Sequence, residues 1–216
     1  MAAAFRHPLR PSIDSPASST YHFLVQTALE HEFVSVEDYL SAEEVAEIRH
    51  EYIGGAVYAM AGTTIEHNYI AQNIAFAART HLKGKPCKVL MENVKVRLYL
   101  QSQEIFYYPD VMIGCDPRDT APLFLRYPKM LFEVTSKSTE RLDRHEKRSA
   151  YQAIETLLEY VLVAQDRLEV TLLRRANQWQ PEVFNRPEDI LTLPSIGLRL
   201  PLSTIYEGAL PEKVKS

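Results

Sequence analysis

The order of helical and strand patterns from residue 63 onward constrains the fold more than any other feature. Thr63 followed by Glu66 is a helix-capping signal, and apolar residues then recur every three to four positions until Gly84 and Pro86. Segments rich in β-branched and aromatic residues follow, and then a charged helical pattern at 139–154 and another strand pattern. The predicted strands are 88–91, 94–100, 105–108, 111–115, 130–135, 160–163 and 168–173. This alternation predicts an α/β fold with a mixed sheet and helices packed on it.

Two further elements are predicted before this series. Ser35, followed three residues later by Asp38, is a loose capping signal for a short helix at 35–46. The Gly54-Gly55 pair lies between two strand-like segments and tolerates the positive φ of a tight turn. The sequence therefore predicts an N-terminal helix and a β-hairpin over 50–60.

A length of 216 residues suits one domain with a sizeable core. Residues 1–32 carry few hydrophobic side chains and read as a flexible leader, 33–210 as a single domain and 211–216 as a tail. The proline-rich C-terminal part predicts short strands and turns that finish the sheet.

The charge balance limits the ways in which such a domain could bind nucleic acid. The formal net charge is −4, so a broad positive field that holds phosphates is excluded, and any nucleic-acid contact must be local. No apolar run reaches the ~18 residues of a membrane span.

The chain has two cysteines, Cys87 and Cys115, each within an apolar segment and without a CxxC pair. We expect both to be small buried core residues that form no disulfide, which favours a reducing compartment, the cytoplasm.

Two carboxylates interrupt strands that are otherwise apolar. Asp110 follows Pro109 at the start of the 111–115 strand, and Glu133 lies inside the 130–135 strand. Asp110 alone has an ordinary interpretation as a cap or turn residue, but an ionised carboxylate in a core strand is costly without compensation. Adjacent strands lie ~4.8 Å apart, so two acids at matching heights could converge on one divalent ion. Oxygen ligands of this kind favour Mg²⁺ or Mn²⁺ over Zn²⁺.

The charged helical pattern offers a cation to these acids. Asp143, Lys147 and Tyr151 are spaced i, i+4, i+8, which puts them on one helix face. An ordinary surface ion pair is an equally good interpretation for Asp143.

Together, several blocks resemble the Uma-type endonucleases of bacteria, a family of the PD-(D/E)xK nuclease superfamily. The resemblance covers about 33–202 and depends on all the blocks together. They are His50-Glu51-Tyr52-Ile53-Gly54-Gly55, Val57-Tyr58-Ala59-Met60, His67, Tyr108-Pro109-Asp110-Val111, Glu133 through Glu140, Asp143 through Lys147 to Tyr151, and Glu159-Tyr160-Val161-Leu162-Val163.

The resemblance implies a restriction-endonuclease-like αβββαβ core in which Asp110 and Glu133 hold the metal ion. It also implies additional ligand or acid–base roles for Glu51 and His67, whose ordinary interpretations are a strand-edge acid and a helix-start histidine. The superfamily lysine that follows the second acid by two residues is replaced here by Thr135. Either Lys147 supplies the missing cation or efficient catalysis has been lost; Lys137 is a weaker substitute.

An intact site of this kind would hydrolyse phosphodiester bonds of nucleic acid, with DNA as the favoured substrate. Nearby aromatic and basic residues could contact phosphates and stack on bases, or could be sheet packing and solvated charge. They are Tyr107, Tyr108, Tyr127, Arg118, Arg126, Arg141 and Arg144.

Two alternatives stay open. The first is a non-catalytic nucleic-acid-binding or assembly module on a nuclease scaffold, which Thr135 favours. The second is a homo-oligomer, such as a homodimer, in which Trp179 and Phe184 cover an apolar patch.

Overall fold

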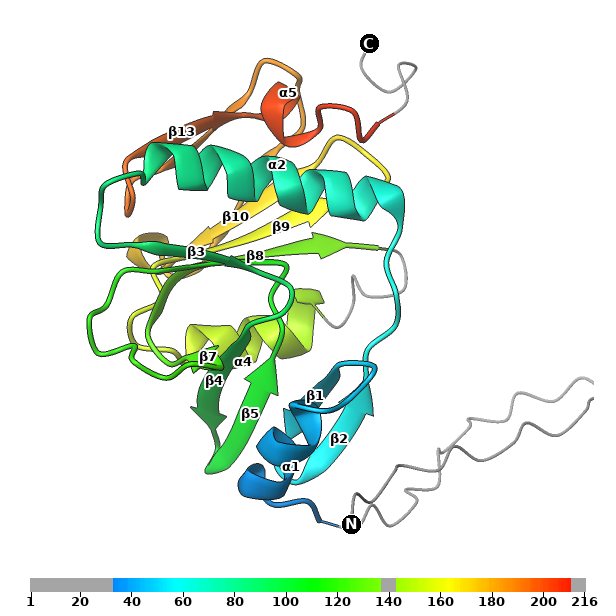
Figure 1. Cartoon of the computed structure of the whole chain (residues 1–216). Coiled ribbons are helices and arrows are strands. Elements are labelled where there is room, and N and C mark those ends of the chain that lie inside the picture. Colours follow the sequence, from blue (N-terminus) through cyan, green and yellow to red (C-terminus); the bar gives the residue numbers. More distant parts are fainter. Residues whose placement is uncertain (1–32, 137–142, 211–216) are drawn as a thin grey trace, which may run out of the picture. The chain divides into compact units, whose positions relative to one another are not determined.

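In the computed structural model the strands divide between two main sheets, which Figure 1 shows one above the other. The structure describes residues 33–136 and 143–210, which belong to one unit, Glu32–Ser216. The predicted leader (1–32) and tail (211–216) lie outside the described residues. The predicted α/β class with a mixed sheet is confirmed, since in the six-stranded sheet β8 (Pro128–Thr135) and β9 (Glu159–Ala164) pair in parallel and the other pairs are antiparallel.

The larger sheet has six strands in the order β11-β10-β9-β8-β6-β3. Its central strands β6 and β9 are buried along their whole length and β8 everywhere except at Lys129, which explains their nearly continuous apolar sequences. The strand bounds are β3 Lys88–Met91, β6 Val111–Gly114, β8 Pro128–Thr135, β9 Glu159–Ala164, β10 Val170–Arg174 and β11 Pro181–Phe184.

The long helix α2 (Ile65–His81) covers one face of this sheet (Figure 1). Its buried side chains, Ile70, Ala71, Ile74, Ala75 and Ala78, recur at helical spacing and pack in one core with side chains of β6 and β8. The N-cap is Thr64 rather than the predicted Thr63, and its side chain accepts a hydrogen bond from the backbone N–H of His67. The same core includes residues of β12 (Ile190–Leu193), β13 (Leu198–Pro201) and α5 (Leu202–Ile205).

The second sheet has the order β2-β1-β5-β4-β7. Its strands are β1 His50–Ile53, β2 Ala56–Ala59, β4 Lys95–Leu100, β5 Gln103–Tyr107 and β7 Phe124–Leu125, and α1 (Val36–Glu43) precedes it. The predicted hairpin is confirmed, with φ of 54° at Gly54 and 102° at Gly55. Ser35 caps α1 as predicted.

The predicted helix at 139–154 is observed in part. A π-helical turn, Asp143–Lys147, leads into α4 (Arg148–Gln152), while residues 137–142 lie outside the described part of the chain. After β10, a short 3-10 helix spans Arg175–Asn177. Side chains of α4 pack with those of β4, β5 and the main sheet in a second core.

The expectation for the cysteines was wrong. Cys87 and Cys115 form a disulfide, with 4.1 Å between their Cα atoms. The reason is the strand register: Lys88 pairs with Gly114, so the residue before β3 and the residue after β6 are cross-strand neighbours. Both side chains are half-buried rather than buried in the core.

Two other expectations concern the surface. Trp179 and Phe184 form no exposed apolar patch, because each is half-buried and packs against a core. In the part of the chain that the structure describes, we find no helix with the length and hydropathy of a membrane span.

Candidate active site

The two predicted acids lie opposite one another. Val111 of β6 pairs with Phe132 of β8 in antiparallel register, so one more step places Asp110 across from Glu133. Residues directly opposite in such a pair have Cβ atoms roughly 5 Å apart and point to the same face of the sheet. The register therefore places the two acidic side chains on the same face of the sheet, next to the start of β6.

Asp110 is fixed by two contacts to one oxygen atom. Its Oδ2 accepts a hydrogen bond from the backbone N–H of Val134 at 2.6 Å, and His67 Nε2 lies 3.2 Å from the same atom. Within the described residues, no hydrogen bond engages Oδ1, and the side chain is 16% exposed. The contacts of Oδ2 thus hold the carboxylate of Asp110 in place.

Glu133 is buried in a more polar group of side chains. Tyr151 donates its hydroxyl to Glu133 Oε1 at 2.7 Å, and Lys147 Nζ lies 3.2 Å from the same oxygen. Lys147 Nζ also lies 3.1 Å from Glu51 Oε1, so one ammonium bridges two acids from β8 and β1. A buried carboxylate is tolerable only with such compensation.

The side chains of Tyr107 and Tyr151 also lie close to Lys147. Its Nζ lies 5.4 Å from the ring centre of Tyr107, and this ring packs edge-on against that of Tyr151. Burial raises the pKa of Tyr107 to about 12, and Glu51 adds to the shift; burial and Glu133 raise the pKa of Tyr151 well above its usual value. Both hydroxyls are therefore neutral at physiological pH, and that of Tyr151 is a proton donor to Glu133.

Lys147 brings a cation to Glu133, although it does not occupy the motif position of the superfamily lysine. Thr135 lies on β8 two residues after Glu133, so both side chains point to the same face, and Thr135 is buried. Lys147 arrives from the π-helical turn instead. Lys137 and the side chain of Asp143 lie outside what the structure describes.

A second polar cluster lies next to Glu51 in the chain, through His50, and was not predicted from the sequence. Tyr108 donates its hydroxyl to Glu43 Oε1 at 2.8 Å and accepts a hydrogen bond from Lys95 Nζ at 3.1 Å. Glu43 also contacts His50, the residue before Glu51. Burial lowers the pKa of Lys95. Glu43, Lys95 and Tyr108 are far apart in the sequence, so no local spacing relates them.

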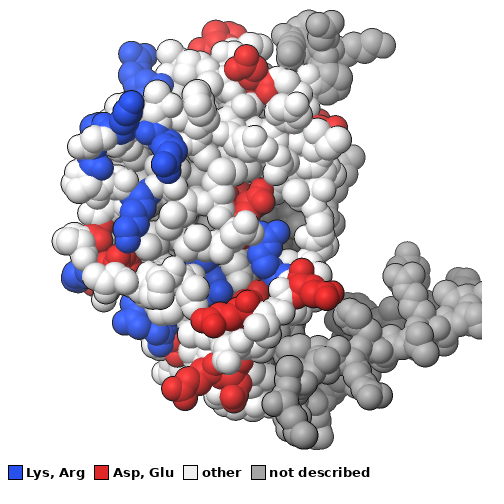
Figure 2. All heavy atoms as spheres, viewed as in Figure 1, with Lys and Arg blue, Asp and Glu red and all other residues white. Residues whose placement is uncertain are grey.

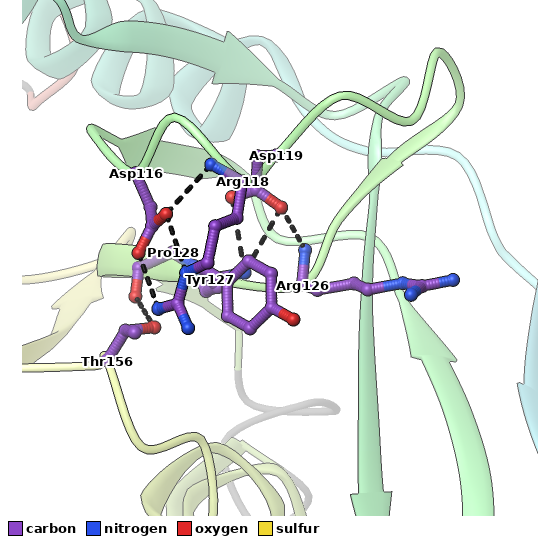
Figure 3. A network of polar contacts seen from close by, with 7 residues as sticks. All are labelled: Asp116, Arg118, Asp119, Arg126, Tyr127, Pro128 and Thr156. Carbon is purple, nitrogen blue, oxygen red and sulfur yellow. Dashed lines mark hydrogen bonds and ion pairs between the residues drawn. The ribbon is translucent and has the colours of Figure 1, made fainter.

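The proposed base-stacking role of the tyrosines fails for Tyr107 and Tyr108, because each is only 3% exposed. Tyr127 is also engaged, since the Arg118 guanidinium lies 4.1 Å from its ring centre (Figure 3). Arg118 in turn forms hydrogen bonds with Asp116, which lower the pKa of that carboxyl to about 2.

Figure 3 also shows polar contacts between Asp119 and the residues that precede β8. The buried Asp119 carboxylate accepts hydrogen bonds from the backbone N–H groups of Arg126 and Tyr127. These contacts give the loop a structural role. The side chains of Arg141 and Arg144 lie outside the described part of the structure.

The donor set fits a divalent cation with few protein ligands. No group of three or more His, Cys, Asp or Glu side chains that could hold a metal ion is present among residues 33–136 and 143–210. Mg²⁺, however, is commonly bound through one or two carboxylates and keeps several waters. Asp110 and Glu133, opposite one another, are two such carboxylates, and Lys147 and Tyr151 both engage Glu133 Oε1.

Comparisons with known proteins agree with this fold. The crystal structure of a protein from Anabaena variabilis, described as "a putative nuclease belonging to DUF820", matches with a TM-score of 0.65 and 18% identity. The match covers 80% of this chain and 97% of that chain. It confirms the predicted restriction-endonuclease-like fold class.

Two proteins of Synechocystis sp. are similar in sequence. The uncharacterized protein slr1290 is 33% identical over 177 residues, which are 81% of this chain and 92% of that protein. The uncharacterized protein sll1609 is 28% identical over 135 residues, 61% of this chain and 75% of that protein. The family model Uma2, described as "Putative restriction endonuclease", matches residues 36–203. The resemblance seen in the sequence is thus confirmed, and the chain belongs to the Uma2 family of nucleases.

Proposed function

We propose that this protein is a metal-dependent endonuclease that hydrolyses phosphodiester bonds of DNA. The observation that carries the proposal is the pairing of Asp110 with Glu133 across β6 and β8, with Lys147 Nζ 3.2 Å from Glu133. Two carboxylates and a cation at one end of a sheet are the groups that metal-assisted phosphodiester hydrolysis requires.

Asp110 and Glu133 would hold the divalent ion, Mg²⁺ or Mn²⁺. Such an ion, when bound, supplies positive charge that polarises a phosphate and lowers the pKa of a water molecule. The backbone N–H of Val134 and the His67 ring orient Asp110, and the Tyr151 hydroxyl orients Glu133. These contacts fix both acids before substrate arrives, which is the preorganisation that catalysis needs.

Lys147 would stabilise the negative charge that develops on the phosphate in the transition state. Lys147 is 6% exposed, and its ammonium is held between Glu51 and Glu133, so the charge is already oriented in a buried place. His67, at 3.2 Å from Asp110, is in position to accept or deliver a proton near the reacting phosphate.

A second candidate function is a nucleic-acid-binding module without catalysis. The observation in its favour is Thr135, which stands where the superfamily motif has its lysine. The position of Lys147 favours the enzyme instead, because the cation is present at the acids although it comes from another element. A homodimer is compatible with either function.

The proposal includes a cytoplasmic location, where DNA and Mg²⁺ are both present. In that compartment thiols are kept reduced, so Cys87 and Cys115 would be present there mainly as thiols. These cysteines lie at the far end of β3 and β6 from Asp110, and the proposed chemistry does not use them.

Cleavage of supercoiled plasmid and of single-stranded DNA, each with Mg²⁺ or Mn²⁺ at low salt, tests the proposal. We compare wild type with Asp110→Asn and Glu133→Gln, which keep the side-chain shape and remove the charge. The exposed Glu188→Gln is the matched control for loss of one carboxylate. Wild type and the control should nick the plasmid, and both site variants should fall to the background seen in EDTA.

Equal cleavage by wild type and Asp110→Asn would show that Asp110 is not part of the site of cleavage. If no protein cleaves DNA, the binding module becomes the better account, and RNA is then tested as substrate in the same comparison.

A further inference from the structure

A groove lies where α2 ends and β3 begins, and its lining includes no residue of the candidate active site. Its volume is about 710 Å³. The lining residues are Phe76, Arg79, Thr80, Leu82, Lys83, Gly84, Lys85, Cys87, Lys88, Val89 and Leu90. It is therefore bounded by the last turns of the helix, the connecting loop and the edge strand of the main sheet.

The lining contains four cations and no carboxylate. These are Arg79, Lys83, Lys85 and Lys88, and all four side chains are exposed. Figure 2 shows Lys and Arg side chains gathered on this side of the molecule, where α2 ends and β3 begins. In a chain whose formal net charge is −4, such a local excess of positive charge stands out.

Structural roles account for only part of this charge. Arg79 lies in the last turn of α2, where a cation interacts favourably with the helix dipole. Lys88 Nζ donates to the backbone oxygen of Asp119, and Lys85 Nζ lies 3.2 Å from a ring nitrogen of His81. Among the described residues, none of the four cations forms an ion pair. A bound anion would therefore meet four cations that no carboxylate of the groove neutralises.

We propose that this groove binds the phosphate backbone of the nucleic acid beside the site of cleavage. Phe76 is 75% exposed at the same groove and offers an aromatic face for an unpaired base. The inference deepens the proposed function and rests on it for the choice of nucleic acid as the partner.

The position of the groove suits one continuous ligand. Lys88 begins β3, and Met91 at its other end pairs with Val111, the residue after Asp110. Three residues of strand span roughly 10 Å, which corresponds to about three nucleotide steps of duplex. A nucleic-acid backbone lying along β3 would run from the groove toward Asp110.

Binding without cleavage tests the proposal directly. The full-length protein is titrated in EDTA against a fluorescein-labelled 20-base-pair duplex, and anisotropy is recorded from about 50 to 200 mM salt. Wild type is compared with Lys83→Gln/Lys85→Gln. The control is Arg186→Gln/Arg199→Gln, which removes two exposed cations from other parts of the surface. Thermal melting verifies that both double variants are folded.

The groove variant should bind at least tenfold more weakly at low salt. The slope of log K against log [salt] should become shallower by about 2, since each phosphate contact contributes about 0.9. The control should keep the wild-type affinity and slope. If the groove variant binds like the control, the proposal is overturned.

The two proposals can fail separately. If wild type binds DNA through the groove but no metal-dependent cleavage occurs, the groove assignment stands and the catalytic one falls. If Asp110-dependent cleavage occurs while the groove variant binds as tightly as the control, the catalytic assignment stands and the groove assignment falls.

Discussion

At the scale of single residues, Lys147 links the chemistry of the site to its stability. Its ammonium lies between Glu51 and Glu133, and both the lysine and Glu133 are buried. Removing one partner of a buried charged group costs more than the net interaction is worth, because the remaining charges lose their compensation. A divalent ion bound by the acids would restore that compensation.

We therefore predict that Lys147→Met destabilises the metal-free protein by about 3–5 kcal/mol. Added Mg²⁺ should recover part of this loss and should stabilise the variant more than it stabilises wild type, because the ion replaces the missing positive charge. Urea unfolding in EDTA and in Mg²⁺ measures both effects.

Lys129→Met, at a half-buried lysine on the same strand as Glu133, controls for loss of a lysine. A Lys147→Met protein as stable as wild type in EDTA would show that the two acids need no cation. DNA cleavage by this variant should be slower than by wild type, and it should reach its maximum at a Mg²⁺ concentration no higher than wild type needs.

Among the site residues, the sequence predicted those that a strand or a helix brings into place. Asp110 and Glu133 were predicted because a carboxylate in an apolar strand is unusual, and Lys147 and Tyr151 because they share a helix face. The polar cluster of Glu43, Lys95 and Tyr108 was not predicted. Its members belong to different elements, so only the folded chain brings them together.

At the scale of elements, local patterns predicted strands and helices well but did not predict their partners. The hairpin around Gly54-Gly55 and the helix from Thr64 follow from turn and capping residues. The hairpin of β4 and β5 leaves the main sheet and pairs with β1, which no local pattern indicates. The Cys87–Cys115 disulfide was missed for the same reason, since it depends on the register of β3 with β6.

That disulfide should stabilise the attachment of the edge strand β3. It closes a loop with a sequence separation of 28, for which the loss of chain entropy in the unfolded state corresponds to about 3–4 kcal/mol. We predict that dithiothreitol lowers the urea midpoint of wild type by a matching amount. Alkylation followed by intact-mass measurement establishes which form is present in each sample.

The double variant Cys87→Ala/Cys115→Ala is the control, because its midpoint should not respond to dithiothreitol. Equal midpoints for oxidised and reduced wild type would contradict the prediction.

Glu159, at the start of β9, is another buried acid, and its effect on the free energy of unfolding can be measured as a function of pH. Burial raises its pKa despite the opposing effects of Ser195 and Arg174. The folded state therefore holds the proton more tightly than the unfolded state, and the stability of wild type falls as pH rises above the ordinary carboxyl pKa. Glu159→Gln, which is neutral throughout, lacks this fall.

We predict that the stability of Glu159→Gln relative to wild type increases from about pH 4 to about pH 7. Urea unfolding across this range measures it, with the exposed Glu188→Gln as the control for general charge effects. A relative stability that decreases with pH would mean that the Arg174 ion pair, at 3.4 Å, outweighs the cost of burial.

At the scale of the whole molecule, the candidate site depends on both main sheets. Asp110 and Glu133 come from the six-stranded sheet, whereas Glu51 comes from β1 of the five-stranded sheet. Lys147 joins the two, because its ammonium contacts Glu51 and Glu133. A change that makes β1 more mobile should therefore displace Glu51 and Lys147, even though Asp110 and Glu133 are unchanged.

The segment that precedes α1 tests this dependence. The backbone N–H of Val34 donates to Gly55 O, and Tyr52 donates its hydroxyl to Val34 O, each at 3.0 Å, while Ser35 caps α1. Because Tyr52 follows Glu51 on β1, these contacts hold the strand that carries one of the acids. We predict that a chain of residues 33–216 keeps the thermal midpoint and the DNA cleavage rate of the full-length protein.

A chain of residues 37–216 loses the cap and both hydrogen bonds, which together contribute about 2–3 kcal/mol. Its thermal midpoint should fall by about 5–10 °C, and its cleavage should be slower because Glu51 and Lys147 are less well held. A stable and fully active 37–216 chain would show that the five-stranded sheet positions Glu51 without this segment. A 33–216 chain that melts early would instead mean that the domain extends before residue 33.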